Sequence, residues 1–444
     1  MTTSTLVQSV RSVERIHVLD AVRGFALLGI LLMNIPYFAL PEETVSNLNI
    51  RNEYSGPNFY AWWIITMFFE GSMRGLFSMM FGAGMVLLTT RLSKNMHIDS
   101  AAEIYYRRLI WMLLFGLIDA YIILWPGDIL YSYAVCGLFL FPLRNIKPRH
   151  LFVIAGILML FFVAKISYQR HEPLRNKIAA EAILKKKLPP GKQTLAQKEI
   201  VDKWKGFQER QKLENKKKQV TAEIRKTKGT YATLWSHYAD VNTYLESSDF
   251  YQSGFLDCLI FMIIGIAFYQ LKIITGERTQ NFYLLFALAG YAVALPLIYF
   301  QIKTSVSVRF DVIKYLERIP IQTYEIRRLG LTIGHLGMLM LLYKSGFFSW
   351  IFNIWAKVGQ MAFSNYLLQN ITCGLIFYGF GFNYFNELDR YQLYLIVPCV
   401  WTLNIVFSYI WLRFFSIGPF EWIWRSLTYW NVQPIRKKDK VLVH

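Results

Sequence analysis

Two pairs of oppositely charged residues stand at the edge of long apolar runs or inside them. Asp20 and Arg23 precede the stretch "GFALLGILLMNI", and Glu70 and Arg74 interrupt the run from Phe59 to Thr90. Residues three or four apart share one face of a helix. Ionisable side chains at membrane depth are candidates for function, and the planar fork of arginine suits phosphate or carboxylate groups. We therefore predict that these four residues bind an anionic substrate.

A structural interpretation of the first pair stays open beside the functional one. Asp20 stands where a helix N-cap would be, and its carboxylate could accept hydrogen bonds from free backbone N–H groups. Arg23 could extend its guanidinium to the cytoplasmic edge of the membrane. On this interpretation the pair caps and orients the first helix and binds no ligand.

Acid–base chemistry has two candidates within the predicted spans. Asp119 lies in the apolar run "LLFGLIDAYIILW", and His335 is the only histidine inside a span. Either side chain could take a proton from an attacking hydroxyl or amine. His335 also follows Gly330 and Gly334, whose spacing is typical of closely packed membrane helices, so it could instead join two helices by a hydrogen bond.

Further polar residues extend the predicted substrate-binding set. Asp128 follows the turn "PG" and could bind substrate or cap the next helix. Asn365 and Gln369 lie four residues apart and could line a polar cavity or hydrogen-bond a neighbouring helix. Glu421 and Arg425 lie opposite aromatic residues in "PFEWIWRSLTYW", which predicts an amphipathic helix at the membrane interface.

The composition indicates the environment in which these residues act. Of the 444 residues, 54% are hydrophobic and 17% are charged, against about 25% charged in an average soluble protein. A bilayer core about 30 Å thick needs about 20 helical residues per crossing. Backbone groups in lipid must bond internally, and none of the apolar runs alternates as a barrel strand would. We predict an all-α, polytopic transmembrane helix bundle of about ten helices in a lipid bilayer, with these spans: Gly24 to Leu40, Phe59 to Thr90, Tyr106 to Trp125, Ile129 to Leu143, Leu151 to Ser167, Gly254 to Leu271, Phe282 to Phe300, Leu329 to Tyr343, Ile354 to Phe380 and Tyr391 to Phe415.

The distribution of charge predicts the orientation and division of the chain. Short loops rich in Lys and Arg face the cytoplasm, which places both termini there. For one charged stretch, Tyr168 to Asp249, the sequence predicts a soluble helical insertion on the outer side. We expect four parts: an N-terminal membrane half with five spans (1–167), the insertion (168–249), a C-terminal membrane half with five spans and an interfacial helix (250–430), and a basic tail (431–444).

Two kinds of site are not predicted. The four cysteines lie inside predicted spans, without CxxC spacing or a nearby histidine cluster, so neither a metal site nor a disulfide framework is indicated. The formal charge of +19 is explained by cytoplasmic flanks and the insertion, so no nucleic-acid partner is expected. The basic insertion could instead attract anionic headgroups or an anionic small molecule.

Several motifs resemble those of the bacterial YeiB family, named for domain of unknown function 418. They are "LDAVRGFALLGILLMNI", "FSMMFGAG", "GDILYSYAVCGLFL", "MAFSNYLLQN", "FYGFG" and "WLRFFSIGPFEWIWRSLTY". The resemblance covers most of the chain outside the insertion. It implies a multi-pass protein of the bacterial inner membrane, often described as a transporter and similar to a wider group of transmembrane acyltransferases. The positions that match the family pattern are Asp20, Arg23, Gly24, Asp128, Asn365, Glu421 and Arg425.

The chain also departs from this pattern. Asp119 stands where members usually have histidine, Arg74 where lysine is common, and Gln360 where a basic residue is usual. The missing histidine would be the natural general base of an acyl transfer. An aspartate can serve if burial raises its pKa towards neutrality.

Two functional classes follow from these residues. In the first, Arg23 or Arg74 holds the phosphates of a cytoplasmic thioester donor such as acyl-CoA, and the acyl group moves to an envelope glycan or lipid. Asp119 or His335 would then deprotonate the acceptor. In the second, the same charges line an alternating-access path for a small amphiphilic or anionic solute. We favour the acyltransferase-like interpretation, because the two halves show no repeat of the kind common in transporters.

Overall fold

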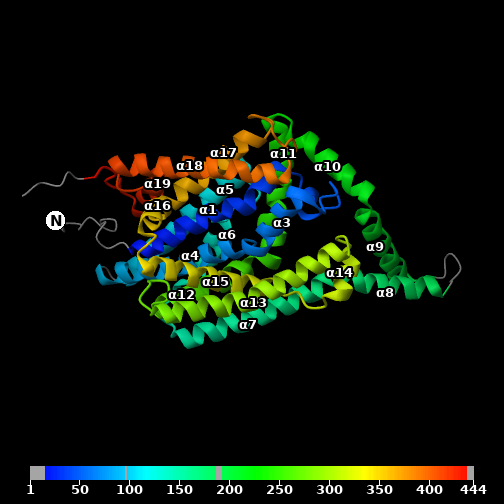
Figure 1. Ribbon diagram of the computed structural model, residues 1–444, viewed down its shortest axis with the longest axis horizontal. Helices are drawn as coiled ribbons and strands as arrows, with labels where there is room; N and C mark the ends of the chain where they lie inside the picture. The colour runs from blue at the N-terminus through cyan, green and yellow to red at the C-terminus, as the bar shows by residue number, and fades with distance from the viewer. Residues whose placement is uncertain (1–15, 96–97, 187–192, 438–444) are drawn as a thin grey trace, which may run out of the picture.

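The computed structural model describes residues 16–95, 98–186 and 193–437 (Figure 1). Within these residues every regular element is a helix, and the one β-type contact is an isolated bridge between Phe415 and Arg436. The prediction of an all-α bundle is confirmed. Its physical basis is the length of the apolar runs, because a helix satisfies all its backbone groups within one segment.

The N-terminal half begins with a long helix that runs through the middle of the bundle. Its elements are α1 (His17–Ala39), α2 (Glu42–Ser46), α3 (Gly56–Phe68), α4 (Ser72–Asn95), α5 (Ile98–Ile118), the π-helical turn η2 (Asp119–Ile123), α6 (Leu130–Leu138), the 3₁₀ turn η3 (Phe141–Asn145) and α7 (Pro148–Arg170). The predicted span from Phe59 to Thr90 is split into α3 and α4. Gly71 lies at this break with a φ of +75°, a conformation that glycine adopts without a steric penalty.

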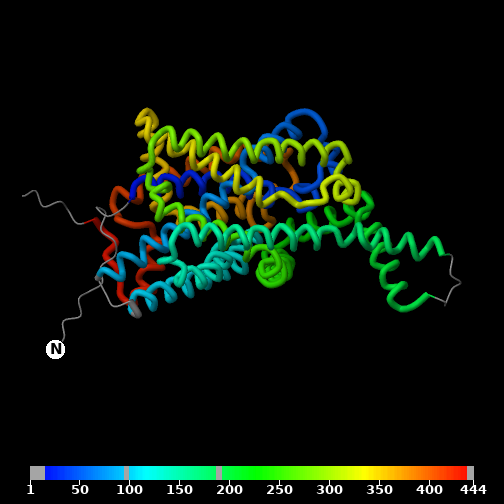
Figure 2. The backbone as a smooth tube through the Cα atoms, turned by 90° about the horizontal axis from the view of Figure 1, so that it is seen from below, coloured from blue at the N-terminus to red at the C-terminus, as the bar shows by residue number. Residues whose placement is uncertain are grey.

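The insertion is helical and returns to the bundle. It comprises α8 (Glu172–Lys185), α9 (Leu195–Gln211), α10 (Leu213–Thr227), α11 (Tyr231–Tyr244) and the π-helical segment η4 (Leu245–Gly254). Figures 1 and 2 show α8 and α9 extending beyond one end of the bundle. Helix α10 packs on α2, where Lys216 pairs with Glu43 at 3.2 Å, and the Gly379 N–H donates to the Thr227 carbonyl at 3.0 Å.

The C-terminal half begins with α12, which is buried along almost its whole length and packs mainly against α4 and α7 of the N-terminal half. Its helices are α12 (Phe255–Gln270), α13 (Gln280–Ser307), α14 (Val312–Arg318), α15 (Tyr324–Ser345), α16 (Ser349–Gln360), α17 (Ala362–Phe377), α18 (Arg390–Phe414) and α19 (Pro419–Tyr429). The predicted span from Ile354 to Phe380 is interrupted at Met361, between α16 and α17. The start of α17 is held by a side chain from α19, as described below.

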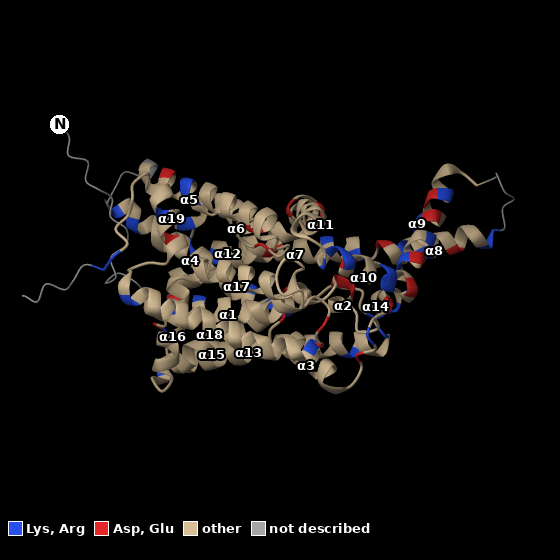
Figure 3. Ribbon diagram, turned by 90° about the horizontal axis from the view of Figure 1, so that it is seen from above, with Lys and Arg blue, Asp and Glu red and all other residues tan. Residues whose placement is uncertain are grey.

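The distribution of charge supports a membrane environment. Figure 3 shows Lys, Arg, Asp and Glu gathered at the two ends of the bundle and in the insertion, with mostly uncharged helices between them. Within the described part of the chain, six helical segments are long and apolar enough to cross a membrane: His17–Ala39, Gly56–Lys94, Pro148–Lys185, Tyr231–Gln270, Gln280–Ser307 and Arg390–Phe414. The other predicted spans are also helical, but they form shorter or interrupted helices, namely α5 with η2, α6, α15, and α16 with α17.

Residues 16 and 437 lie at the same end of the bundle, opposite the end from which α8 and α9 extend (Figures 1 and 2). This arrangement agrees with a chain that crosses the membrane an even number of times. The assignment of that end to the cytoplasm of a bacterial cell, and the division into four parts, stay predictions.

Candidate functional site: an arginine-lined cavity

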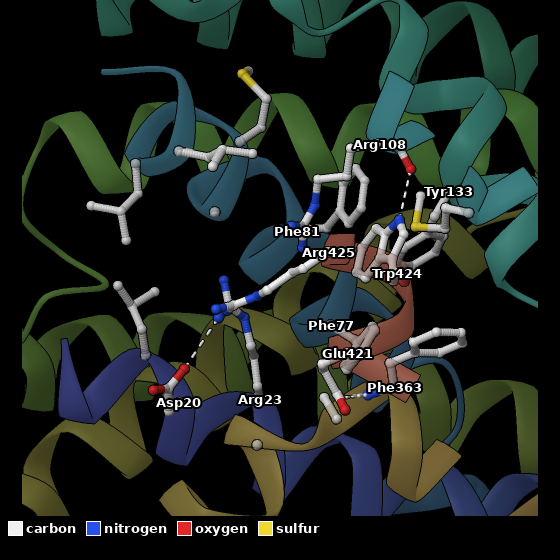
Figure 4. Close-up of a pocket in the computed structure, with 18 of the residues that line it drawn as sticks. Asp20, Arg23, Phe77, Phe81, Arg108, Tyr133, Phe363, Glu421, Trp424 and Arg425 are labelled. Carbon is white, nitrogen blue, oxygen red and sulfur yellow. Dashed lines mark hydrogen bonds and ion pairs between the residues drawn. The ribbon is translucent and has the colours of Figure 1, made fainter. Parts of the chain in front are cut away.

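A cavity of about 270 Å³ lies at the bundle end that holds residues 16 and 437. Its walls come from α1, α4, α5, α6, the α16–α17 junction and α19 (Figure 4). Much of the wall is apolar, with Phe77, Phe81, Met85, Leu109 and Met112 among its residues. Cationic side chains line the rest, so the cavity suits a molecule with both an anionic and an apolar part. The cationic side chains belong to Arg23, Arg91, Arg108 and Arg425.

Arg23 is placed in this cavity by close contact between α1 and α16. A methyl group on Gly24 would collide with the Trp355 carbonyl, and one on Gly359 would collide with the carbonyl of Asp20. With the helices this close, Arg23 points towards α4. Its Nη1 donates to Asp20 Oδ1 at 3.2 Å, and its Nη2 donates to the Met80 carbonyl at 3.4 Å. Asp20 therefore orients the Arg23 guanidinium. The Arg23 side chain remains 27% exposed.

Arg108 and Arg425 reach the same cavity from α5 and α19. The Arg108 guanidinium lies 3.7 Å from the centre of the Trp424 ring, and the Trp424 indole donates to the Arg108 carbonyl at 2.8 Å. Figure 4 shows the Arg23, Arg108 and Arg425 side chains pointing into one space. Arg108 lies within electrostatic range of both other arginines.

The positive charge of this cavity is incompletely balanced. Among the described residues, Asp20 pairs with Arg23, whereas the structure records no ion pair for Arg108 or Arg425, and Arg425 Nη1 is buried without a hydrogen-bond partner. Like charges in a poorly hydrated space repel one another strongly. A bound anion would relieve this repulsion.

Glu421 does not neutralise the arginines, because its carboxylate is used elsewhere. It accepts hydrogen bonds from the backbone N–H groups of Phe363 at 2.8 Å and Ser364 at 3.1 Å, and from the Ser364 hydroxyl. These are free N–H groups at the start of α17, where a carboxylate is favoured. Burial raises the pKa of the Glu421 carboxyl above its ordinary value. Glu421 and Arg425, which we expected at the membrane interface, thus face the interior of the bundle.

A pair of carboxyl groups lies behind the inner wall of the cavity. Asp128 accepts from the backbone N–H groups of Leu130 at 3.0 Å and Tyr131 at 2.8 Å, so it caps α6. The Tyr366 hydroxyl, whose side chain lines the cavity, donates to Asp128 at 3.4 Å. Asp119 is fully buried and lies against Asp128. The pair is therefore joined to the cavity through Tyr366.

Asp119 is held on its other side by α17. Asn370 Nδ2 donates to Asp119 Oδ2 at 2.8 Å, and Asp119 Oδ1 has no hydrogen-bond partner in the described part of the chain. Two adjacent buried carboxyl groups cannot both carry a full charge at low cost. Protonation of one of the two carboxyl groups would remove this cost.

Other predicted residues lie away from this cavity. Arg74 pairs with Asp257 at 2.9 Å, and Glu70 pairs with Arg327 at 3.1 Å, in a separate cluster of α4, α12 and α15. The reason is that buried arginines and carboxylates on α12 and α15 supply both residues with partners. We predicted that Arg23 and Arg74 both bind the anionic substrate, whereas the structure places their side chains at separate cavities.

His335 is also absent from the lining of the arginine cavity. It contacts the Tyr291 hydroxyl at 2.8 Å and the Phe68 carbonyl at 2.6 Å, and thus connects α15 to α13 and α3. This geometry agrees with the helix-joining alternative for His335 rather than with a general base.

The two amides of α17 are buried. Asn365 Nδ2 donates to the Val358 carbonyl at 3.1 Å and to Ser408 Oγ at 2.8 Å, so it ties α17 to α18. Gln369 is 2% exposed, and its Nε2 has no hydrogen-bond partner in the described ranges. Neither amide lines the arginine cavity.

Sequence reasoning misses Arg108, Tyr366, Trp424 and Asn370. From the sequence, Arg108 is only a charge flanking a span, and Trp424 is only an interfacial anchor. Asn370 directly follows the predicted Gln369 and is a detectable signal, because an amide in a span needs a partner.

Comparisons with known proteins place these features in a family context. Residues 268–431 match the model of a family described as "Protein of unknown function (DUF418)". The chain is 28% identical to the uncharacterised protein YxaH of Bacillus subtilis over 438 residues, covering 96% of this chain and 98% of that protein. It is 28% identical to the uncharacterised protein YeiB of Escherichia coli over 435 residues, covering 94% and 96%.

A third relative is an uncharacterised 39.9 kDa protein in the amylase 3' region of Bacillus acidopullulyticus. It is 24% identical over 427 residues, covering 96% of this chain and 97% of the relative. No solved structure matches the chain.

Proposed function

Since the chain belongs to the YeiB/DUF418 family, whose members YxaH and YeiB align with it along nearly its whole length, we propose that it is a membrane-bound acyltransferase. The observation that carries this proposal is the convergence of Arg23, Arg108 and Arg425 on one cavity with apolar walls. An acyl-CoA has the matching chemistry, because its phosphates suit guanidinium groups and its acyl chain suits an apolar wall. The donor would enter from the end that holds residues 16 and 437.

Proton transfer would use the Tyr366 hydroxyl at the cavity wall. An acceptor hydroxyl on an envelope glycan or lipid gives its proton to Tyr366 as Tyr366 passes its own to the ionised carboxylate of the Asp128–Asp119 pair. The acceptor oxygen forms a bond with the thioester carbonyl carbon, and the carbon–sulfur bond breaks. The proton returns through Tyr366 to the leaving thiolate. Tyr366 is then the catalytic candidate, and the carboxyl pair sets its proton affinity.

A second cavity supports an alternative function, transport of a small amphiphilic or anionic solute. It measures about 200 Å³ and lies towards the insertion. Tyr133 lines the arginine cavity and Arg74 lines the second one, and the Tyr133 hydroxyl donates to the Arg74 carbonyl at 3.3 Å. Tyr133 also contacts Ser78 Oγ at 2.6 Å. The linings of the two cavities are thus connected through Tyr133 and the Arg74 carbonyl, as a path with alternating access requires.

The test uses the full chain in lipid nanodiscs with radiolabelled acyl-CoA. We expect saturable binding that Arg425→Gln weakens, and slow thioester cleavage, with water as acceptor, that Tyr366→Phe abolishes without loss of binding. Arg149, which is exposed at the same bundle end, provides the control variant Arg149→Gln.

The outcomes separate the two functions. Uptake of intact acyl-CoA into proteoliposomes, with binding but no cleavage, would favour transport. A wild-type protein that neither binds nor cleaves acyl-CoA would reject the acyltransferase proposal.

A further inference from the structure

The second cavity has a charge pattern unlike that of the first. It lies between the last turns of α7, the segment η4, and the starts of α12 and α15, on the side of the bundle nearer the insertion. Its lining includes the acids Asp249, Asp257 and Glu325 and the bases Arg74 and Arg170. Both signs of charge are therefore presented to a space of about 200 Å³.

Part of this charge is already paired within the protein. Asp257 Oδ2 lies 2.9 Å from Arg74 Nη2, and the fully buried Arg328 forms a second ion pair with Asp257. With two guanidinium partners, Asp257 has little capacity left for a ligand. Arg74 is similarly committed to Asp257.

Glu325 and Arg170 retain binding capacity. Glu325 is 8% exposed, its Oε2 lies 3.4 Å from Arg328 Nη1, and that oxygen accepts no hydrogen bond in the described residues. Arg170 is exposed at the end of α7, and the structure records no ion pair for it within the described ranges. Arg170 interacts electrostatically with Glu325, but no ion pair between the two is recorded among the described residues.

Glu325 pairs with Arg328 but keeps one carboxylate oxygen without a hydrogen bond, and no ion pair is recorded for Arg170 in the described ranges. Two such groups on one cavity suit a ligand that carries both charges. A primary ammonium has three N–H donors and can satisfy the buried carboxylate. The guanidinium fork of Arg170 suits a phosphate. Phe162, Val163 and Ile166 of α7 form the apolar side of the cavity. Only 22% of the most apolar stretch of the helical segment Pro148–Lys185 is buried inside the protein. Hydrocarbon attached to the ligand could therefore lie along α7.

We propose that this second cavity binds a phosphoethanolamine group, with its ammonium at Glu325 and its phosphate at Arg170. The position agrees with such a ligand, because Arg170 is the last residue of α7, the apolar helix of the candidate span Pro148–Lys185, and lipid headgroups lie where an apolar helix ends. The group could belong to phosphatidylethanolamine of the surrounding membrane or to a free solute. The proposal is independent of acyl transfer, since no step of that reaction uses this cavity.

Native mass spectrometry of the full chain provides the first test. The detergent-solubilised protein is offered equal amounts of phosphatidylethanolamine and phosphatidylcholine, which differ in whether the headgroup nitrogen carries N–H donors. We expect the wild type to retain phosphatidylethanolamine about tenfold or more over phosphatidylcholine, the ratio expected for a charge-assisted hydrogen bond. Both Glu325→Gln and Arg170→Gln should weaken retention of phosphatidylethanolamine, and Glu325→Gln should also bring the ratio close to one.

Matched controls use exposed residues away from both cavities. Asp202→Asn and Arg413→Gln remove one charge of each sign and should leave the lipid preference unchanged. Arg425→Gln should also leave it unchanged, which separates this site from the arginine cavity. A melting curve of each variant shows whether the bundle is intact.

The second arm distinguishes the two sources of the ligand. Soluble phosphoethanolamine is added to the protein in phosphatidylcholine nanodiscs, and the shift of the melting temperature is measured. Saturable stabilisation that both substitutions remove, without a lipid preference, would support the same chemistry with a free solute. The proposal is overturned if neither molecule is preferred or bound, or if binding survives either Glu325→Gln or Arg170→Gln.

Discussion

Replacing Arg23 by lysine tests whether this residue binds a ligand or only orients the first helix. The substitution keeps the positive charge but removes the planar fork. In the structure one Nη atom of Arg23 lies 3.2 Å from Asp20 and the other lies 3.4 Å from the Met80 carbonyl. A lysine ammonium can keep the hydrogen bond to Asp20, but it cannot also present a second, fixed pair of donors to an anion. We therefore expect insertion and folding to be retained while binding weakens.

The size of the effect follows from the hydrogen bonds that a lysine cannot make to the anion. One hydrogen bond between charged groups contributes about 1.5–3 kcal/mol, and each 1.4 kcal/mol changes a dissociation constant by about tenfold. The Arg23 side chain is 27% exposed, so solvent screens the interaction and the lower end of the range applies. We expect Kd for acyl-CoA to rise about tenfold in Arg23→Lys. Arg23→Gln, which also removes the charge, should bind more weakly still.

The assay is equilibrium binding of radiolabelled acyl-CoA to wild type and variants in the same nanodiscs, at two salt concentrations. Arg149→Lys is the matched control, because Arg149 is exposed at the same end of the bundle and does not line the cavity. Melting curves should agree between the two lysine variants. Full affinity in Arg23→Lys, with wild-type binding established, would show that the pair serves only capping and orientation.

Three further predictions concern orientation, packing and pH. In a variant without its own cysteines, Asp202→Cys should react with an impermeant maleimide in intact spheroplasts and Arg149→Cys should not; the reverse pattern would invert the topology. Gly359→Ala should destabilise the bundle by about 1–3 kcal/mol, seen as a lower melting temperature, because its methyl group would collide with the Asp20 carbonyl. Burial raises the pKa of Glu223, on α10, to about 7 from an ordinary value of 4.5. The folded state therefore binds the proton more tightly than the unfolded state, so the contribution of Glu223 is fully present below pH 4.5 and is lost as the pH rises through 7. The melting temperature should fall between about pH 4.5 and about pH 7, and Glu223→Gln should reduce that fall.

The helices are predictable because their signal is local. A run of apolar residues forms a helix in lipid whatever the rest of the chain does. The break at Gly71 is also predictable, since the run from Phe59 to Thr90 exceeds one crossing and contains several glycines. The interruption at Met361 is not, because the carboxylate that caps α17 comes from Glu421, on a helix far along the chain.

The candidate site shows the same division between local and distant signals. Asp20 and Arg23 lie one helical turn apart, so their contact follows from spacing alone. Arg108 and Arg425 join them only because α5 and α19 meet at one end of the bundle. The sequence also does not predict where Arg74 lies. Its partner Asp257 is on α12, and no local pattern connects the two residues.

The binding of Glu421 to the start of α17 has a thermodynamic consequence for α19. This helix carries Trp424 and Arg425 to the cavity, and it is fastened by a carboxylate that occupies two backbone N–H groups of α17. Moving α19 outward would leave those groups unpaired in apolar surroundings, at a cost of about 1–3 kcal/mol each. Ligand affinity and helix docking are therefore linked quantities: a ligand that binds Arg425 stabilises the docked position of α19, and a substitution that weakens the Glu421 hydrogen bonds lowers the affinity for that ligand.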